Sequence, residues 1–154
     1  MSQSLQPDFE KMKTIEGGPY GKSLTGIGIN LLVRNVEKTA AFLEEVLQTQ
    51  TIRTNSNFAI IRYHDEHFML HQDGTYAENE LLSILPEAGA RGAGIELRFY
   101  HTDPDEAEAR ANKLADIYQC SVLRSCSDRP HGLRECFILS EDGYCFVPSR
   151  HLKD

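Results

Sequence analysis

The chain has 154 residues, of which 16 are basic and 23 acidic, giving a net charge of −7. This length can bury most of the apolar surface of a single domain without disulfides or a structural metal, and the acidic balance argues against nucleic acid or an anionic membrane as a partner. Because no apolar run approaches the roughly 20 residues of a membrane span, and the first residues lack the features of a signal peptide, we expect a cytoplasmic protein.

Residues 1–23 form the first segment, which is polar and aperiodic. The turn-forming run Gly17-Gly18-Pro19 lies near its end. Such a segment offers little apolar surface to a core. We therefore expect an N-terminal arm that buries few side chains, followed by a single domain over 24–154.

The next segment, residues 25–71, has the pattern of a βαβββ module. Apolar residues first alternate, as in a strand, and then recur at helical spacing after Asn35, a favourable N-cap. The predicted elements are a strand near 26–34, a helix over 36–47, a strand near 51–54, and a hairpin of 58–64 and 67–71 around Asp65-Glu66.

A linker over 72–91 leads to a second module, residues 92–150. The apolar run Leu81–Leu85 in the linker predicts a short helix or a covering segment. The run Asp103-Pro104-Asp105-Glu106 combines an N-cap, a proline at the first helical position and a capping-box acid. The predicted elements are a strand over 93–100, a helix over 104–118, a strand near 120–124, and a hairpin over 134–148 that turns on Asp142-Gly143.

The two modules begin alike, which indicates a duplication. Gly26-Ile27-Gly28-Ile29 is matched 66 positions later by Gly92-Ala93-Gly94-Ile95. Two similar half-domains bury their faces against one another, and a ligand cavity tends to form where they meet. The predicted fold class is α+β, with two βαβββ modules forming curved, mainly antiparallel sheets and the helices outside.

Three segments of the chain resemble the glyoxalase, bleomycin-resistance and extradiol dioxygenase superfamily, also called vicinal oxygen chelate proteins. They are Val33–Leu43 at the entry to the first helix, Pro130–Glu135, and Glu141–Tyr144. The likeness covers about residues 25 to 150. It implies that each module curls into half of an open barrel, that the two halves form a cup for a ligand, and that the protein is a homodimer.

The resemblance also implies where a divalent metal would bind. The family's first histidine falls at Gly28, its second at Gly94 or Glu96, and its final carboxylate at Val147. In the first module the position equivalent to Val147 is near Leu70 or His71. At most Glu96 and His71 could then act as ligands, whereas a useful site needs three or four protein donors. We therefore expect no metal and no other cofactor.

Strand alternation predicts which side chains line the cup. If Leu31 and Leu97 face the helices, their neighbours along each strand face the opposite way. A turn on Asp142-Gly143 would set Ile138 opposite Val147 and place Arg134 on the cup side. The predicted ligand-binding residues are Arg62, His71, Glu96, Arg98, Tyr100 and Arg134. Each arginine has an alternative interpretation as a surface residue or a structural ion-pair partner.

Two functions compete. The first is a metal-free small-molecule-binding protein that holds an anionic or polar aromatic ligand through Arg98 and Arg134, with Glu96 orienting Arg98. The second is a glyoxalase-like lyase or isomerase, or a dioxygenase. It would hold a divalent metal through an atypical set such as His71, Glu96 and Glu135, or work by acid/base catalysis without a metal. A scaffold without a ligand is a third possibility.

Overall fold

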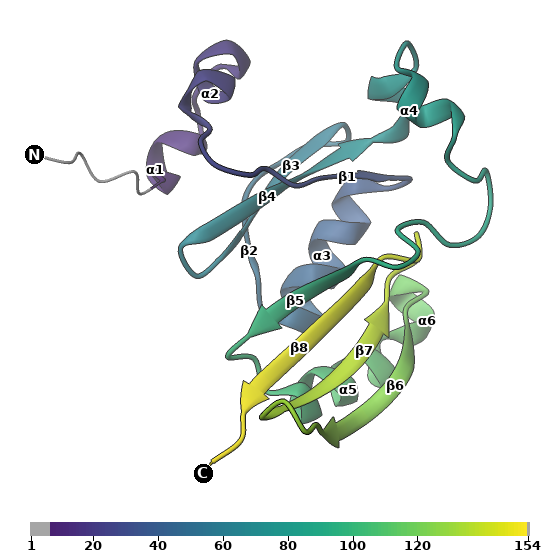
Figure 1. Cartoon of the computed structure of the whole chain (residues 1–154). Coiled ribbons are helices and arrows are strands. Elements are labelled where there is room, and N and C mark those ends of the chain that lie inside the picture. The colour runs from purple at the N-terminus through teal and green to yellow at the C-terminus, as the bar shows by residue number, and fades with distance from the viewer. Residues whose placement is uncertain (1–6, 154) are drawn as a thin grey trace, which may run out of the picture.

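The computed structural model of the protein describes residues 7–153, which contain two four-stranded sheets (Figure 1). The first sheet has the order β1-β4-β3-β2, and the second has the order β5-β8-β7-β6. In each sheet the first and last strands of the module pair in parallel, and the other neighbours are antiparallel. This arrangement confirms the predicted pair of βαβββ modules.

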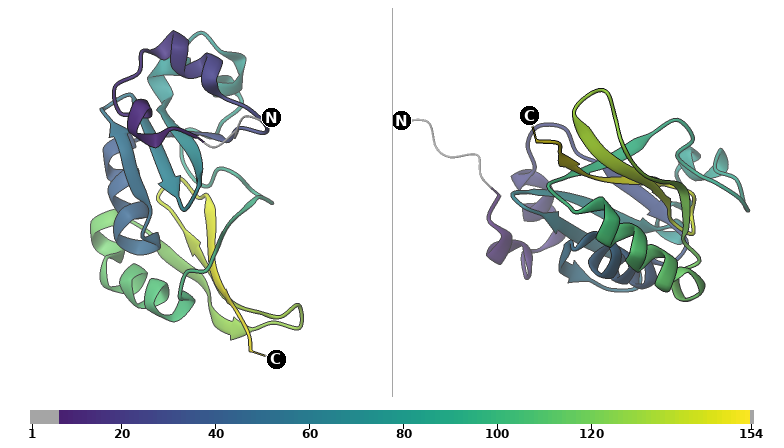
Figure 2. Two further views of the ribbon diagram at one scale, coloured as in Figure 1. Left: turned by 90° about the vertical axis from the view of Figure 1, so that its left-hand side faces the viewer. Right: turned by 90° about the horizontal axis from the view of Figure 1, so that it is seen from below.

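The elements follow the predicted order. The first module contains β1 (Asn30–Val33), α3 (Val36–Leu47), β2 (Gln50–Thr54), β3 (Phe58–Tyr63) and β4 (Glu66–Gln72). The second contains β5 (Glu96–Tyr100), α5 (Pro104–Lys113), α6 (Ala115–Tyr118), β6 (Ser121–Asp128), β7 (Leu133–Leu139) and β8 (Cys145–His151). The helices α3, α5 and α6 lie on one side of the two sheets (Figure 2, left).

Local capping explains where the two long helices begin. Asn35 accepts a hydrogen bond of 3.0 Å from the Lys38 backbone N–H at the start of α3, as its predicted N-cap role requires. Asp103 accepts from the backbone N–H of Asp105 at the start of α5. The predicted second helix is interrupted, because Leu114 leaves helical geometry (φ −103°, ψ 8°) and divides it into α5 and α6.

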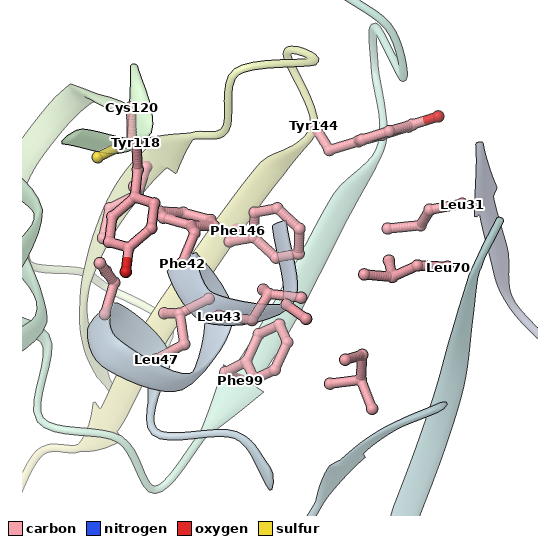
Figure 3. Packing of buried hydrophobic residues seen from close by; sticks show 14 of the residues in the cluster. Leu31, Phe42, Leu43, Leu47, Leu70, Phe99, Tyr118, Cys120, Tyr144 and Phe146 are labelled. Carbon is pink, nitrogen blue, oxygen red and sulfur yellow. The ribbon is translucent and has the colours of Figure 1, made fainter. Parts of the chain in front are cut away.

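The main apolar core joins both modules and lies between the helices and the sheets (Figure 3). The Phe146 ring of β8 lies 5.9 Å from the Phe42 ring of α3 and 5.9 Å from the Phe99 ring of β5. Leu43 and Leu47 of α3 are fully buried in the same cluster. Because α3 belongs to the first module and β8 to the second, neither module has a complete core of its own.

A buried polar network also joins the two modules. Asp142, in the loop before β8, is 1% exposed and accepts from the Arg34 backbone N–H at 3.2 Å and from Arg34 Nη1 at 2.9 Å. Arg34 follows β1, so this contact ties the end of the first module's first strand to the second module. The Tyr144 hydroxyl donates to the Leu32 carbonyl at 2.8 Å.

The linker is fixed to the same region by an ion pair. The Arg91 side chain is 3% exposed, and its two terminal nitrogens donate to the two carboxylate oxygens of Asp73 at 2.7 Å each. Arg91 Nη1 also donates to the Leu32 carbonyl at 3.0 Å. The pKa of Asp73 is lowered, chiefly by its hydrogen bonds from Arg91. Such bidentate, charge-assisted pairs are both strong and directional.

The linker otherwise contains two short helices, η1 (Asp73–Tyr76) and α4 (Glu80–Ser83). The predicted short helix is therefore present, but it does not cover the core. Leu81 and Ile84 are both exposed. Within the part of the chain that the structure describes, no helix combines the length and apolar character needed to cross a membrane.

The expectation that residues 1–23 bury little is wrong for the described residues 7–23. They form α1 (Phe9–Met12) and α2 (Gly17–Ser23), which cover the face of the first sheet opposite α3. Phe9, Met12 and Tyr20 are buried there with Ile60 of β3. Phe9 and Met12 have helical spacing, but one pair of apolar residues in a four-residue helix is too short a pattern to predict burial, so the sequence did not reveal this second cluster. Residues 1–6 of the predicted arm lie outside the described residues.

Two predicted turns also differ. The first hairpin turns on His64-Asp65 instead of Asp65-Glu66, since Tyr63 pairs with Glu66. In the last hairpin Ile138 pairs with Phe146, and the predicted pairing of Ile138 with Val147 is wrong. The physical reason is that the carboxylate of Asp142 binds Arg34. The loop therefore takes five residues, 140–144, and the register moves by one position.

We predict that Asp73→Asn lowers the free energy of unfolding by about 3 kcal/mol at pH 7, because it leaves a buried guanidinium without its carboxylate. Urea unfolding measures this loss. A matched control is Asp65→Asn, whose exposed pair with Arg62 spans 3.9 Å. The control should cost less than about 1 kcal/mol. Equal losses of stability in the two variants would contradict the conclusion that the buried Asp73–Arg91 pair stabilises the fold.

The Asp73–Arg91 pair also predicts that the free energy of unfolding depends on pH. The folded-state pKa of Asp73 lies below its ordinary value of 3.8, so ionisation of Asp73 stabilises the fold above that value. This stability is lost as the pH falls through the folded-state pKa. The stability difference between the wild type and Asp73→Asn should therefore be full near neutral pH and shrink below pH 3.8. A stability difference that stays constant down to strongly acidic pH would argue against a stabilising role for the ionised Asp73 carboxylate.

Candidate functional site

The open face of the second sheet, opposite α5 and α6, carries a group of charged side chains. Arg98 and Tyr100 point to this face from β5. The alternate residues of the strand point the other way: Phe99 belongs to the core, and Leu97 packs against it. Glu135 points to it from β7. We call the charged group the Glu135 cluster, and it consists of Glu96, Arg98, Arg129, His131 and Glu135.

Glu135 lies at the centre of the cluster. Its side chain is 4% exposed. One carboxylate oxygen, Oε2, accepts a hydrogen bond from Arg98 Nη2 and lies 3.2 Å from His131 Nε2. The other oxygen lies 3.9 Å from Arg129 Nε. Arg98 also donates to Glu96 at 2.9 Å, so it connects the exposed carboxylate of Glu96 to the buried one.

These contacts determine the charges at the site. Burial alone would raise the pKa of Glu135, but its hydrogen bonds with Arg98 and His131 outweigh burial and hold the pKa below its ordinary value. Burial alone would lower the pKa of Arg98, whereas its hydrogen bonds with Glu135 and Glu96 raise it. Both groups are therefore ionised near neutral pH, and each holds the other in place.

A row of polar side chains crosses the sheet through Glu135. Ser127 of β6 and Ser149 of β8 are its two cross-strand partners, and Tyr100 is the next partner beyond Ser149. The hydroxyls of Ser127 and Ser149 are buried and have no hydrogen-bond partner among the described residues. Buried hydroxyls without partners are uncommon in native proteins. The row therefore offers unused donors and acceptors beside a fixed pair of charges.

The structure brings together three of the predicted ligand-binding residues. Glu96, Arg98 and Tyr100 share the open face as expected, and the Arg98 guanidinium carbon lies 5.8 Å from the centre of the Tyr100 ring. Tyr100 is 46% exposed, which leaves it accessible to a ligand or a partner surface.

Arg134 was predicted to face the cup, but it does not lie on the open face of the second sheet. It shares the helix side of β7 with the core residue Cys136, and its guanidinium donates to both carboxylate oxygens of Asp105 on α5 at 2.8 Å. It also donates to Asp128 at 3.0 Å. The change of hairpin register by one position exchanges the roles of Arg134 and Glu135. Arg134 is thus a structural ion-pair partner.

Arg62 and His71 belong to the first sheet, whose open face is covered by the N-terminal helices and η1. The Arg62 guanidinium lies 4.0 Å above the Phe9 ring. His71 packs edge-on against Phe58 at 4.9 Å and against Tyr76 at 5.6 Å, and burial lowers its pKa. Neither residue joins the Glu135 cluster.

Five residues of the site were not in the predicted ligand set: Ser127, Arg129, His131, Glu135 and Ser149. Glu135 had been considered only as a metal ligand. Arg129 begins the turn before β7, where its N–H donates to the Leu133 carbonyl at 2.8 Å. The strand pattern around 120–124 ended too early to include Ser127. A β6 extended to Asp128 would have paired with β7 and placed Ser127 beside Glu135.

A comparison with models of known protein families finds no match to this chain, and a comparison with curated protein sequences finds none either. Solved structures do match. A glyoxalase/bleomycin resistance protein/dioxygenase family enzyme from Burkholderia phytofirmans PsJN superposes with a TM-score of 0.61 at 16% sequence identity, over 80% of this chain and 96% of that chain. A glyoxalase-related enzyme from Fulvimarina pelagi gives a TM-score of 0.63 at 14% identity, over 83% and 89%.

The chain has the glyoxalase/bleomycin resistance/dioxygenase fold. TioX from Micromonospora sp. ML1 shares it with a TM-score of 0.56 at 14% identity, over 84% of this chain and 98% of that chain. The fold implied by the sequence resemblance is therefore confirmed. At such low identities the likeness concerns the fold, and the chemistry must be argued from the residues of this chain.

The residues of this chain do not fit the metal that the resemblance implies. Gly28 has no side chain to donate, and Val147 is apolar and pairs across the sheet with Arg98. The Arg98 guanidinium occupies the same face and repels a cation. Within residues 7–153, no group of three or more His, Cys, Asp or Glu side chains is placed to hold a metal ion. His71, Glu96 and Glu135 are thus not brought together within one chain.

We predict that the protein binds no stoichiometric Mn, Fe, Ni or Zn at the Glu135 cluster. The reason is that both carboxylates of the cluster are already paired with Arg98. Metal analysis of protein purified without chelator, followed by titration calorimetry with each ion, measures this. One equivalent of tightly bound metal that is lost in Glu135→Gln would overturn the prediction.

Proposed function

We propose that this protein is a metal-free small-molecule-binding protein of the glyoxalase/bleomycin-resistance type, with its site on the open face of the second sheet. The observation that carries the proposal is the Glu135 cluster. It holds the Arg98 guanidinium of β5 and the Arg129 guanidinium of the turn before β7 around one buried carboxylate, and Arg98 pairs with Val147, where the resemblance implies a metal ligand. The proposal replaces Arg134 by Arg129 as the second arginine of the site.

The cluster favours an anionic or polar aromatic ligand. Arg98 is held by two carboxylates, and its side chain remains 21% exposed. Arg129 Nε lies 3.9 Å from Glu135, which is longer than a hydrogen bond. The N–H groups of Arg129 can therefore donate hydrogen bonds to a ligand. A planar guanidinium binds a carboxylate through two parallel hydrogen bonds. The Tyr100 and His131 rings beside the arginines suit a planar ligand body.

A second copy of the chain is the proposed partner. The open face of the second sheet has no covering element comparable to the N-terminal helices on the first sheet, among the described residues. The exposed apolar side chains of the second module include Ile95, Tyr100 and Leu123. Exposed apolar groups beside a binding face are typical of an interface, and symmetric dimers are the commonest assembly.

We predict that Arg98→Ala weakens the binding of benzoate, used as a probe anion, by about one to two decades, since a charge-assisted hydrogen bond is worth roughly 1.5 to 3 kcal/mol. Arg129→Gln should weaken it by a similar factor. Benzamide, the neutral analogue, should bind weakly to all three proteins. Two-dimensional NMR titration reports both the affinity and the strands that respond.

Arg134→Gln is the matched control, because that arginine lies on the helix side and pairs with Asp105. It should leave benzoate binding unchanged. Thermal unfolding of each variant separates a binding effect from loss of the fold, which matters because Arg98→Ala leaves Glu135 with fewer partners. Benzoate shifts that map away from β5 and β7, or an Arg134→Gln effect as large as that of Arg98→Ala, would refute the proposed site.

We also predict a homodimer. Sedimentation at micromolar concentration should give about twice the chain mass of 17.4 kDa. Tyr100→Asp, which puts a charge on the exposed face, should shift the equilibrium toward the monomer. Ile117→Asp changes a comparably exposed apolar residue on α6 and should not. A monomer mass for the wild type would count against the partner assignment.

A further inference from the structure

A concave region lies on the first module, away from the Glu135 cluster. It is a cavity of about 590 Å³ between α1, the segment that joins α2 to β1, and the β3–β4 hairpin. Figure 1 shows α1 and this joining segment beside the hairpin. The volume falls within the range of about 300 to 1,000 Å³ that is usual for small-molecule sites.

The cavity exists because β1 begins late. The sequence predicted a strand from residue 26, but pairing with β4 starts at Asn30 opposite Met69. The last backbone hydrogen bond before it joins the Met69 N–H to the Ile29 carbonyl at 3.0 Å. The chain before Ile29 departs from the sheet edge, and α1 lies across the gap that this departure opens.

The apolar part of the lining is unusually exposed. Ile27 is 98% exposed and Ile29 is 43% exposed, and both line the cavity. Met12, Ile15 and Leu24 complete the apolar wall. Because the Ile27 and Ile29 side chains would lose contact with water when an apolar ligand binds, the wall favours a ligand with an apolar body.

The charged part of the lining is acidic. Asp8, Asp65 and Glu66 contribute three carboxylates, against one ammonium group from Lys11. Arg62, which does not line the cavity, lies 3.9 Å from Asp65, so one negative charge remains in excess when it is counted. His67 adds an aromatic ring that packs edge-on against Phe9 at 5.8 Å. Burial lowers the pKa of His67, so its ring is neutral near neutral pH. The excess of carboxylates favours a positively charged ligand.

We infer that this cavity binds an organic cation with an apolar body, such as an amphipathic amine. The apolar body lies against Ile27 and the other apolar wall residues, and the ammonium group lies toward Asp65 and Glu66 at the hairpin end. This ligand has the opposite charge to the one proposed for the Glu135 cluster. The two sites can therefore be tested separately in the same protein.

The test compares tryptamine with indole-3-propionate, which share an aromatic body and carry opposite charges. Since the chain contains no tryptophan, indole fluorescence anisotropy reports the bound probe directly. Tryptamine should bind at least about tenfold more tightly than indole-3-propionate to the Arg98→Ala variant, in which the proposed anion site is weakened. Equal affinity of the two probes for that variant would overturn the inference.

Two variants locate the binding. Ile27→Ser should weaken tryptamine binding about fivefold through lost apolar contact, and Glu66→Gln should weaken it about two- to fivefold through lost charge. Ile27 is almost fully exposed, so its replacement leaves the fold intact. Ile117→Ser removes an equally apolar side chain that is 61% exposed on α6 and should have no effect. Tryptamine binding that survives both cavity variants unchanged would also overturn the inference.

Discussion

The structure depends on one buried carboxylate. Asp142 accepts hydrogen bonds from the backbone and the guanidinium of Arg34, and burial raises its pKa even though Arg34 and Arg91 favour its ionised form. The next residue, Gly143, has φ +87°, and a side chain there would collide with the backbone of Ala90. The loop before β8, the end of β1 and the end of the linker therefore fit together in one way. Removing one partner of such a buried pair would leave an uncompensated charge in the interior, which disfavours other arrangements of this loop.

This contact reaches the candidate site through the last hairpin. Because Asp142 is held by Arg34, the loop takes five residues and Ile138 pairs with Phe146. A register one position away would turn Arg134 toward the open face and Glu135 toward the helices, since alternate residues of a strand face opposite sides. The observed register instead puts an acid at the centre of the site and leaves Arg98 and Arg129 around it. The polarity of the site thus follows from a contact between the modules and not from the strand's own pattern.

The two modules have similar folds but different surroundings. The open face of the first sheet is covered by α1 and α2, which bury Phe9, Met12 and Tyr20 against it. The open face of the second sheet carries the Glu135 cluster. The two sheets have the same strand order and therefore equivalent open faces, but the N-terminal helices pack only on the face of the first sheet. The covered face has a cavity beside the late start of β1, whereas the uncovered face carries charged and hydroxyl groups.

The sequence by itself determined the elements whose signals are local. Asn35 and Asp103 cap the helices at the predicted residues, the module order follows from the repeat, and strand alternation placed Glu96, Arg98 and Tyr100 on one face. Tertiary structure decided what depends on distant partners. The burial of Phe9 needs the first sheet, the register of Ile138 needs Arg34, and the grouping of Ser127 with Glu135 and Ser149 needs three strands side by side. Caps and alternation act over a few residues and can be read along the chain, but a register is set by whichever long-range contact has the lowest free energy.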